Sequence, residues 1–241
     1  MKYIALFLSG GIGSRIGGEV PKQYITVGDA PVFSYSLDVL MNCDRLAGVR
    51  IVADPEWEGE IEAFLNKSNY SDGRFMGFSL PGATRQLSIL NGIRDIASDL
   101  DEDEWDDTFV IVHDAARPGL TAALLETLMD ACPGHDGALP VLSMKDTIYE
   151  SKDGKVISGL LDRNTLFAGQ APEAYVLDKY LKANEALLPK DILTISGACE
   201  PAVRYGMDIA LLPGDEKNVK ITTPEDLETF EKTVIDQDRA Y

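Results

Sequence analysis

The sequence predicts an α/β fold in which helices flank a mostly parallel, Rossmann-like sheet, with a projecting β-hairpin arm. Apolar runs of strand length alternate with segments of helical period almost from end to end, which is typical of βαβ units with right-handed crossovers. The composition, 45% hydrophobic and 26% charged residues, is that of a globular protein. The alternation is interrupted once, at residues 146–163. We therefore expect a single domain over 1–241 with that segment as an arm.

The elements follow one another in a regular order. The expected strands are apolar and rich in β-branched residues, and they cover 3–9, 48–53, 75–80, 108–114, 137–144 and 208–214. The expected helices have an apolar periodicity of 3.6 residues, and they cover 31–42, 56–67, 84–98, 121–131, 175–188 and 223–237. The last helix has a well-formed start, with Thr223 as N-cap and Pro224 at the first position.

The arm is predicted from two short β-like runs, 147–151 and 155–161, on either side of an Asp153-Gly154 turn. This hairpin is too polar for a core strand pair, so it should project from the body and pack against a partner. The acidic run 99–107 lies between a helix and a strand, and we expect a solvated loop there.

Composition also excludes several classes of protein. The formal net charge of −18 argues against broad contact with a nucleic-acid backbone. The apolar runs fall short of the ~20 residues of a membrane span, and the first run does not read as a signal peptide. Three scattered cysteines suit a reducing compartment. We expect a cytoplasmic protein without a nucleic-acid or membrane partner.

A glycine-rich stretch, 9–18, follows the first strand and leads to Arg15 and Lys22. It lacks the Gly-Lys-Ser/Thr of a Walker A loop, and Ile16 stands where a dinucleotide fingerprint needs glycine or alanine. Two interpretations remain: a loop whose backbone N–H groups approach a nucleotide phosphate, with Arg15 and Lys22 supplying charge, or a glycine-rich turn with two solvated cations.

Small and charged residues recur after other strands. They include Gly82, Ala83 and Ser88 after the third strand, Asp114 and Arg117 after the fourth, and Asn218 and Lys220 after the last. Because ligands bind at the carboxyl ends of parallel strands, these residues should line one cleft.

Taken together, the segments "SGGIGSRIG…PKQY", "PGATRQLSILNG", "HDAARP", "DTI…LDR" and "NVKITTPEDL" resemble the 2-C-methyl-D-erythritol 4-phosphate cytidylyltransferase family and its relatives, the ribitol-5-phosphate cytidylyltransferases. The resemblance extends from Tyr3 to about Phe230. It implies a nucleotidyltransferase-type fold and an enzyme that joins CTP and a polyol phosphate into a CDP-polyol with release of pyrophosphate. It also implies a homodimer that exchanges the arm.

The resemblance assigns roles by motif. The catalytic cations would be Arg15, Lys22 and Lys220. The nucleotide would be bound by Ser9, Gly10, Gly11, Gly13, Gly82, Ala83, Thr84, Ser88 and Asp114. The polyol phosphate would be held by Arg117, Thr147, Arg163 and Lys220. Asp114 would also bind Mg²⁺ or another divalent cation.

The chemistry suits these residue types. A phosphate monoester is largely dianionic at neutral pH, so the nucleophile arrives deprotonated and needs no general base. Positioning and charge neutralisation remain, which cations and Mg²⁺ supply. We therefore interpret His113 as a residue that fixes its strand tip by a local hydrogen bond. Asp114 is either a turn-former or a metal ligand, and Arg85 either a helix-surface charge or a support for the nucleotide loop.

The sequence departs from the family pattern on the side expected to hold the second substrate. Ala171 replaces a threonine and Glu173 a glutamine, and an acid is missing near Gly197. The preferred substrate is 2-C-methyl-D-erythritol 4-phosphate, with ribitol 5-phosphate or another polyol phosphate as alternatives. A sugar 1-phosphate nucleotidyltransferase, a degenerate non-catalytic scaffold subunit and a redox enzyme also stay open.

Overall fold

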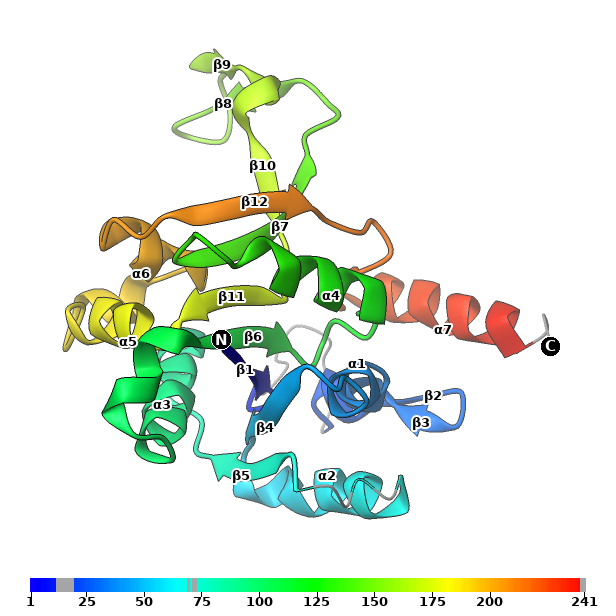
Figure 1. The fold of residues 1–241 in the computed structure, drawn as a ribbon. Coiled ribbons are helices and arrows are strands. Elements are labelled where there is room, and N and C mark those ends of the chain that lie inside the picture. The colour runs from blue at the N-terminus through cyan, green and yellow to red at the C-terminus, as the bar shows by residue number, and fades with distance from the viewer. Residues whose placement is uncertain (12–19, 69, 71–72, 239–241) are drawn as a thin grey trace.

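A mixed eight-stranded sheet forms the centre of the molecule (Figure 1). The computed structural model describes residues 1–11, 20–68, 70 and 73–238. The strands run in the order β10-β7-β11-β6-β1-β4-β5, and β12 pairs with β7 outside this path. Their bounds are β1 Lys2–Leu8, β4 Leu46–Val52, β5 Phe75–Ser79, β6 Thr108–Asp114, β7 Gly137–Ser143, β10 Phe167–Gly169, β11 Glu173–Val176 and β12 Ile209–Pro213.

Strands β1, β4, β5 and β6 are mutually parallel, so their carboxyl ends meet at one edge of the sheet. The side chains of β1 alternate between two apolar layers. Tyr3, Ala5 and Phe7 enter one layer, whereas Ile4 and Leu6 enter the other. A central parallel strand that is buried on both faces needs an almost continuous apolar run, which β1 has. This part of the sheet is the rigid support for whatever lies beyond Leu8 and Asp114.

Helices cover both faces. The layer of Phe7 packs against α1 Val32–Met41, α2 Pro55–Lys67 and α4 Ala122–Ala131. The layer of Leu6 packs against α3 Arg85–Ser98, α5 Leu177–Glu185 and α6 Cys199–Arg204. Short 3-10 turns complete this body: η1 Lys22–Tyr24, η2 Glu102–Asp107 and η4 Asp191–Thr194. The expected three-layer α/β arrangement is confirmed.

The C-terminal helix α7 Pro224–Asp238 lies at one side of the body (Figure 1). Thr223 caps it, because its hydroxyl accepts a hydrogen bond from the N–H of Asp226 at 3.2 Å. A small apolar cluster joins Val234 of α7 to Ile221 and to Val27 of the ribbon formed by β2 Thr26–Val27 and β3 Ala30–Pro31. This contact anchors the segment that carries Lys220.

The structure differs from the expected secondary structure at two places. The predicted helix at 175–188 begins only at Leu177, because Tyr175 and Val176 belong to β11, an antiparallel strand inserted between β6 and β7. Tyr175 is fully buried there and pairs with Val110, so tertiary burial outweighs local periodicity. The acidic run is also no irregular loop, since Glu102–Asp107 forms a 3-10 turn with a capping box at Asp101.

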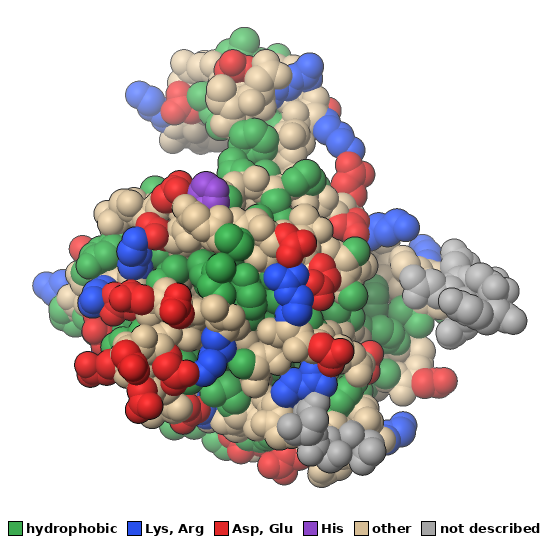
Figure 2. Space-filling view, viewed as in Figure 1, with side chains coloured by type: hydrophobic (Ala, Val, Ile, Leu, Met, Phe, Trp, Pro, Cys, Tyr) green, Lys and Arg blue, Asp and Glu red, His purple; other side chains and the backbone are tan. Residues whose placement is uncertain are grey.

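The arm is a separate two-stranded ribbon that stands away from the body (Figure 1). It consists of β8 Ile148–Glu150 and β9 Gly159–Leu161, followed by the 3-10 turn η3 Arg163–Thr165. Gly154 adopts a φ of 71°, which the predicted turn requires. Large apolar side chains are exposed on the arm and its base, namely Tyr149, Val156, Ile157, Leu160, Leu161 and Phe167. Figure 2 shows apolar surface on the arm and its neck.

Within the part of the chain that the structure describes, no helix combines the length and the apolar character needed to cross a membrane.

Candidate active site

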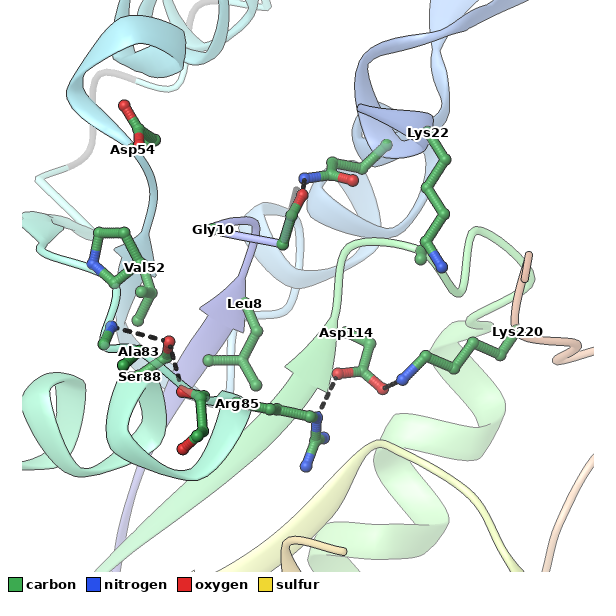
Figure 3. Close-up of a pocket in the computed structure, with 16 residues that line it drawn as sticks. Leu8, Gly10, Lys22, Val52, Asp54, Ala83, Arg85, Ser88, Asp114 and Lys220 are labelled. Carbon is green, nitrogen blue, oxygen red and sulfur yellow. Dashed lines mark hydrogen bonds and ion pairs between the residues drawn. The ribbon is translucent and has the colours of Figure 1, made fainter. Parts of the chain in front are cut away.

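A cavity of about 520 Å³ opens at the carboxyl edge of the parallel strands (Figure 3). Its walls come from segments far apart in the sequence: the ends of β1 and β4, the turn η1, the start of α3, the end of β6 and the segment before α7. This is the volume of an ordinary small-molecule site, and its place agrees with the general rule for open α/β sheets. We refer to it as the nucleotide pocket, after the ligand that the sequence resemblance implies for these residues.

The first wall is the start of the glycine-rich stretch. Gly10 and Gly11 line the pocket directly after β1, and a Cβ at Gly10 would lie 2.7 Å from the Cβ of Pro81, so a larger residue does not fit. The Gln23 amide donates hydrogen bonds to the carbonyl oxygens of Ser9 and Gly11, both at 2.7 Å. The wall is therefore held from behind by a side chain of η1.

The same turn carries Lys22, which lines the pocket and points along it in Figure 3. Tyr24 fixes the turn, since its ring stacks on Trp57 at 4.4 Å and its hydroxyl accepts from the hydroxyl of Ser9 at 2.8 Å. Ser9 is buried, and its hydroxyl is engaged in this hydrogen bond. Ser9 therefore does not line the pocket. Two expected residues, Gly13 and Arg15, lie outside the described residues.

The second wall is the start of α3. Gly82, Ala83, Thr84 and Ser88 all line the pocket. The N–H of Gly82 donates to the hydroxyl of Ser88 at 3.0 Å, and Thr84 caps the helix by accepting from the N–H of Leu87 at 3.2 Å. A Cβ at Gly82 would lie 2.4 Å from the Cβ of Leu87, so this position also requires glycine. The loop presents backbone groups and short side chains to a ligand.

The floor of the pocket is a cluster of charges around Asp114, the last residue of β6. Its Oδ1 accepts from Arg85 Nε at 2.9 Å, and its Oδ2 accepts from Lys220 Nζ at 2.9 Å (Figure 3). Burial alone would raise the pKa of Asp114, but Arg85 and Lys220 together hold that pKa far below its ordinary value. Asp114 is therefore a carboxylate in any physiological buffer.

His113 and Arg117 support this floor from below. His113 is completely buried, and its Nε2 hydrogen bonds with the carbonyl oxygen of Arg117 at 3.1 Å, which is the local role expected for it. Burial lowers the pKa of His113 to about 4, so the ring is neutral at pH 7. Arg117 donates to the carbonyl oxygen of Asn218 at 2.7 Å and does not line the pocket. It ties the end of β6 to the segment of Lys220.

Thr147 and Arg163, the other two residues expected at the polyol phosphate, are not brought to the nucleotide pocket. They line a separate hollow of about 410 Å³ on the arm, together with Leu160, Leu161, Asp162 and Asn164. The Arg163 guanidinium donates to the carbonyl oxygen of Lys145 at 2.6 Å. In the described chain the two hollows share no lining residue.

Three polar residues of the described pocket lining were not among the predicted site residues. Arg85, for which the sequence left two interpretations open, reaches Asp114 from the first turn of α3. Gln23 and Asp54 also line the pocket. The signal for Gln23 was its position beside Lys22, and the signal for Arg85 was its place directly after the N-cap Thr84. Asp54 reads in the sequence only as the N-cap of α2, a role it also has, since it accepts from the N–H of Glu56 at 3.0 Å.

The residues around Asp114 could bind a divalent cation only if a bound ligand supplies further oxygen donors. No group of three or more His, Cys, Asp or Glu side chains suitable for a metal is found among the described residues. Mg²⁺, however, is commonly bound by one or two carboxylates together with substrate phosphates and waters. Asp114 supplies one ionised carboxylate next to a cationic cavity, which is the donor set that such a site needs.

The chemical capacity of the pocket follows from its lining. Lys22, Arg85 and Lys220 converge on one cavity in a chain of net charge −18, and the described lining contains neither histidine nor cysteine. The site can attract and neutralise a polyphosphate, whereas its described residues provide no imidazole base or thiolate nucleophile.

Comparisons with known proteins agree with this geometry. The family model described as "IspD: 2-C-methyl-D-erythritol 4-phosphate cytidylyltransferase" matches residues 3–235. A protein of that name from Geobacillus thermodenitrificans is 32% identical over 227 residues, which are 94% of each chain. One from Nitrosomonas eutropha is 31% identical over 234 residues, 96% of each chain.

Solved structures share the fold. The 4-diphosphocytidyl-2C-methyl-D-erythritol synthase from Anaerococcus prevotii has a TM-score of 0.80 at 21% identity, with 98% of this chain and 96% of that chain covered. The 2-C-methyl-D-erythritol 4-phosphate cytidylyltransferase from Thermus thermophilus has a TM-score of 0.71 at 22% identity, with 95% and 97% covered.

Proposed function

The chain belongs to the 2-C-methyl-D-erythritol 4-phosphate cytidylyltransferase family, and from its pocket we infer that it joins CTP and 2-C-methyl-D-erythritol 4-phosphate, releasing pyrophosphate, in isoprenoid precursor synthesis. The observation that carries this inference is the convergence of Lys22, Arg85 and Lys220 on one cavity with glycine-lined walls. Such a cavity suits a nucleoside triphosphate, because exposed backbone N–H groups and fixed cations both favour phosphate oxygens.

The reaction is a displacement at the α-phosphorus of CTP. A phosphate oxygen of the polyol phosphate forms the new P–O bond, the bond between the α-phosphorus and its bridging oxygen breaks, and pyrophosphate leaves with that electron pair. Because the attacking phosphate is already ionised, no proton has to be removed. This agrees with a neutral, buried His113 outside the pocket.

The contribution of the protein is positioning and electrostatic stabilisation. We assign Lys22 and Lys220 to the phosphate groups, where fixed cations offset the repulsion between two anionic reactants and the charge that develops in the transition state. The loop from Gly82 to Ser88 would recognise cytosine and ribose through its backbone and the Ser88 hydroxyl. Arg15 keeps its expected role as a triphosphate ligand, as a proposal from the sequence.

A divalent cation completes the proposal. Asp114 would hold Mg²⁺ jointly with the triphosphate, where the ion neutralises negative charge on the phosphate oxygens. In the structure the two oxygens of Asp114 accept from Arg85 and Lys220, and these contacts keep the carboxylate ionised and oriented toward the pocket.

The second substrate site draws on a second copy of the chain. Thr147 and Arg163 lie in the hollow on the arm and not in the nucleotide pocket, and the arm exposes apolar side chains such as Val156 and Leu160. We therefore propose a homodimer in which the arm of one copy reaches the nucleotide pocket of the other and supplies the contacts to the polyol phosphate. The free cysteines Cys43, Cys132 and Cys199 suit the cytoplasm as the compartment.

Two of the departures from the family pattern lie outside the nucleotide pocket. Ala171 and Glu173 are both buried, with 2% and 8% of their surfaces exposed, and neither lines the nucleotide pocket. These changes therefore leave the described lining of the pocket unaltered. The proposal of CTP as the nucleotide is therefore unaffected, and the choice of 2-C-methyl-D-erythritol 4-phosphate as the polyol is supported by the family to which the chain belongs.

A pyrophosphate-release assay with CTP tests the function. We expect turnover with 2-C-methyl-D-erythritol 4-phosphate that exceeds turnover with ribitol 5-phosphate. Faster turnover with ribitol 5-phosphate would identify that polyol phosphate as the preferred substrate. Turnover only with sugar 1-phosphates would show that the second substrate is a sugar 1-phosphate and not a polyol phosphate. CTP binding without turnover on any of them would instead identify a non-catalytic member.

A further inference from the structure

Glu173 is a buried carboxylate directly behind the nucleotide pocket, and the reaction described above does not use it. It lies at the first position of β11, next to the end of β6. Its Oε2 accepts a hydrogen bond from the hydroxyl of Tyr175 at 2.6 Å, and its Oε1 lies 3.8 Å from a terminal nitrogen of Arg85. The second distance is that of an ion pair rather than a hydrogen bond.

Arg85 connects Glu173 to the pocket. While one terminal nitrogen faces Glu173, the Nε of the same guanidinium donates to Asp114, and Asp114 in turn accepts from Lys220. Charges therefore alternate in space from Glu173 through Arg85 and Asp114 to Lys220. A planar guanidinium held at two of its edges has little rotational freedom, so Glu173 restricts where Arg85 places Asp114.

The charge on Glu173 is costly to keep. Burial raises the pKa of Glu173, which means that the ionised form is destabilised by its surroundings even with Arg85 and Tyr175 beside it. An uncharged amide of the same shape would avoid that cost. We therefore expect the interaction of Glu173 with Arg85 to contribute to the arrangement of the site.

On the basis of the proposed function, we propose that Glu173 is a positioning residue for cytidylyl transfer, which acts through Arg85 to hold Asp114 and Lys220 in their reactive arrangement. Glu173 itself does not line the pocket, so it would not touch reactants that are bound there. Its effect should therefore appear in turnover and should depend on Arg85.

The test is a double-mutant cycle measured by pyrophosphate release with CTP and 2-C-methyl-D-erythritol 4-phosphate. Glu173→Gln keeps the shape and removes the charge. We expect kcat to fall about tenfold, because small misplacements of charged groups in an active site have effects of this size or larger. The KM for CTP should stay within about threefold of the wild type. In an Arg85→Gln background the same substitution should change kcat less than about twofold, because its target is gone.

A matched control separates this role from general stability. Asp99→Asn also removes one carboxylate that faces a buried arginine, Arg50, but neither residue lines the pocket. It should leave kcat unchanged, and thermal unfolding of all variants reports whether they are folded. The wild-type rate in the same assay reports on the proposed function, whereas only the ratios between variants report on Glu173.

Several results would overturn the inference. An unchanged kcat in folded Glu173→Gln, or an equal loss in both backgrounds, would reduce Glu173 to a structural residue. A lower KM for CTP with an unchanged or higher kcat would show that Glu173 only weakens the positive potential of the pocket.

If Glu173→Gln does not fold, Tyr175→Phe decides in its place, because it removes the hydrogen bond that orients the carboxylate. It should lower kcat about threefold with Arg85 present and have no effect without it. A normal kcat in that variant would contradict the proposal.

Discussion

The nucleotide pocket and the arm differ in how they use charge and apolar surface. In the pocket, Asp114 is buried at the end of a parallel strand and is paired with the half-buried side chains of Arg85 and Lys220. In the arm, Val156 and Leu160 are exposed on a ribbon of two short strands that has no core of its own. Isolated hairpins are at best marginally stable in water. The described pocket is therefore lined by a single chain, whereas the exposed apolar side chains of the arm support the proposed packing against a second copy.

The largest effect should come from the pocket. Lys22→Ala removes a cation at the phosphate wall, and we expect kcat to fall by about two to three orders of magnitude, as for the loss of a principal electrostatic contact. Steady-state kinetics with CTP measures this, and circular dichroism checks the fold. Near-normal turnover in Lys22→Ala would contradict the proposed role of this pocket in binding the triphosphate.

A smaller and more selective effect should come from the arm. Arg163→Ala should raise the KM for the polyol phosphate at least tenfold while the KM for CTP changes little, because this arginine lies in the hollow on the arm and not in the nucleotide pocket. Lys155→Ala is the matched control, since it removes a cation elsewhere on the arm. An equal rise in the KM for CTP and in the KM for the polyol phosphate would contradict the assignment of CTP to the pocket and of the polyol phosphate to the arm.

Assembly should depend on the apolar surface of the arm. Val156→Asp places a charge where we propose that a second copy packs, so the mass in solution should shift toward the monomer, as measured by analytical ultracentrifugation. Val203→Asp is a close control, because Val203 on α6 is 66% exposed and Val156 is 68% exposed. A dimer that persists in Val156→Asp and dissociates in Val203→Asp would place the interface on the body.

The last prediction concerns the stability of the region around His113 and does not concern activity. The pKa of His113 in the folded protein is about 4, below the ordinary value of about 6.5 for an unfolded histidine. The unfolded chain therefore binds the proton first as the pH falls, and the free energy of unfolding decreases between about pH 6.5 and pH 4, by roughly 3 kcal/mol from this group.

His113→Gln keeps a donor for the carbonyl oxygen of Arg117 and cannot titrate, so it should lose this part of the pH dependence in urea unfolding curves. The exposed residue His135 serves as the control for the loss of an imidazole. Parallel curves for wild type and His113→Gln would show that His113 is not held neutral.

The sequence predicted the residues that line the pocket more accurately than it predicted the strands in the second half of the sheet. Asp114 ends strand β6, and Lys22, Gly82 and Lys220 lie in the segments that follow β1, β5 and β12. The carboxyl ends of parallel strands must meet at one edge. Tyr175 and Val176, the last two residues of β11, were assigned to the helix because they merge with the apolar period of α5, and only their burial between β6 and β7 sets their conformation.

Residues that act through partners were harder to place. The turn sequence predicts the arm itself, but the position of Arg163 relative to the pocket depends on tertiary structure and, in our proposal, on a second chain. Arg117 looks like a substrate ligand in the sequence because it follows Asp114, yet its guanidinium bonds to the backbone of Asn218. The pairing of Arg85 with Asp114 joins the start of α3 to the end of β6, which sequence spacing alone does not relate.

The most direct test of the shared site is to mix two variants with impaired activity, Lys22→Ala and Arg163→Ala. If the arm of one copy serves the pocket of the other, each mixed dimer contains one site with an intact pocket and an intact arm. Random exchange of equal amounts should then restore about a quarter of the wild-type activity at low polyol phosphate. Activity no higher than the average of the two separate variants, although mixed dimers form, would contradict the account.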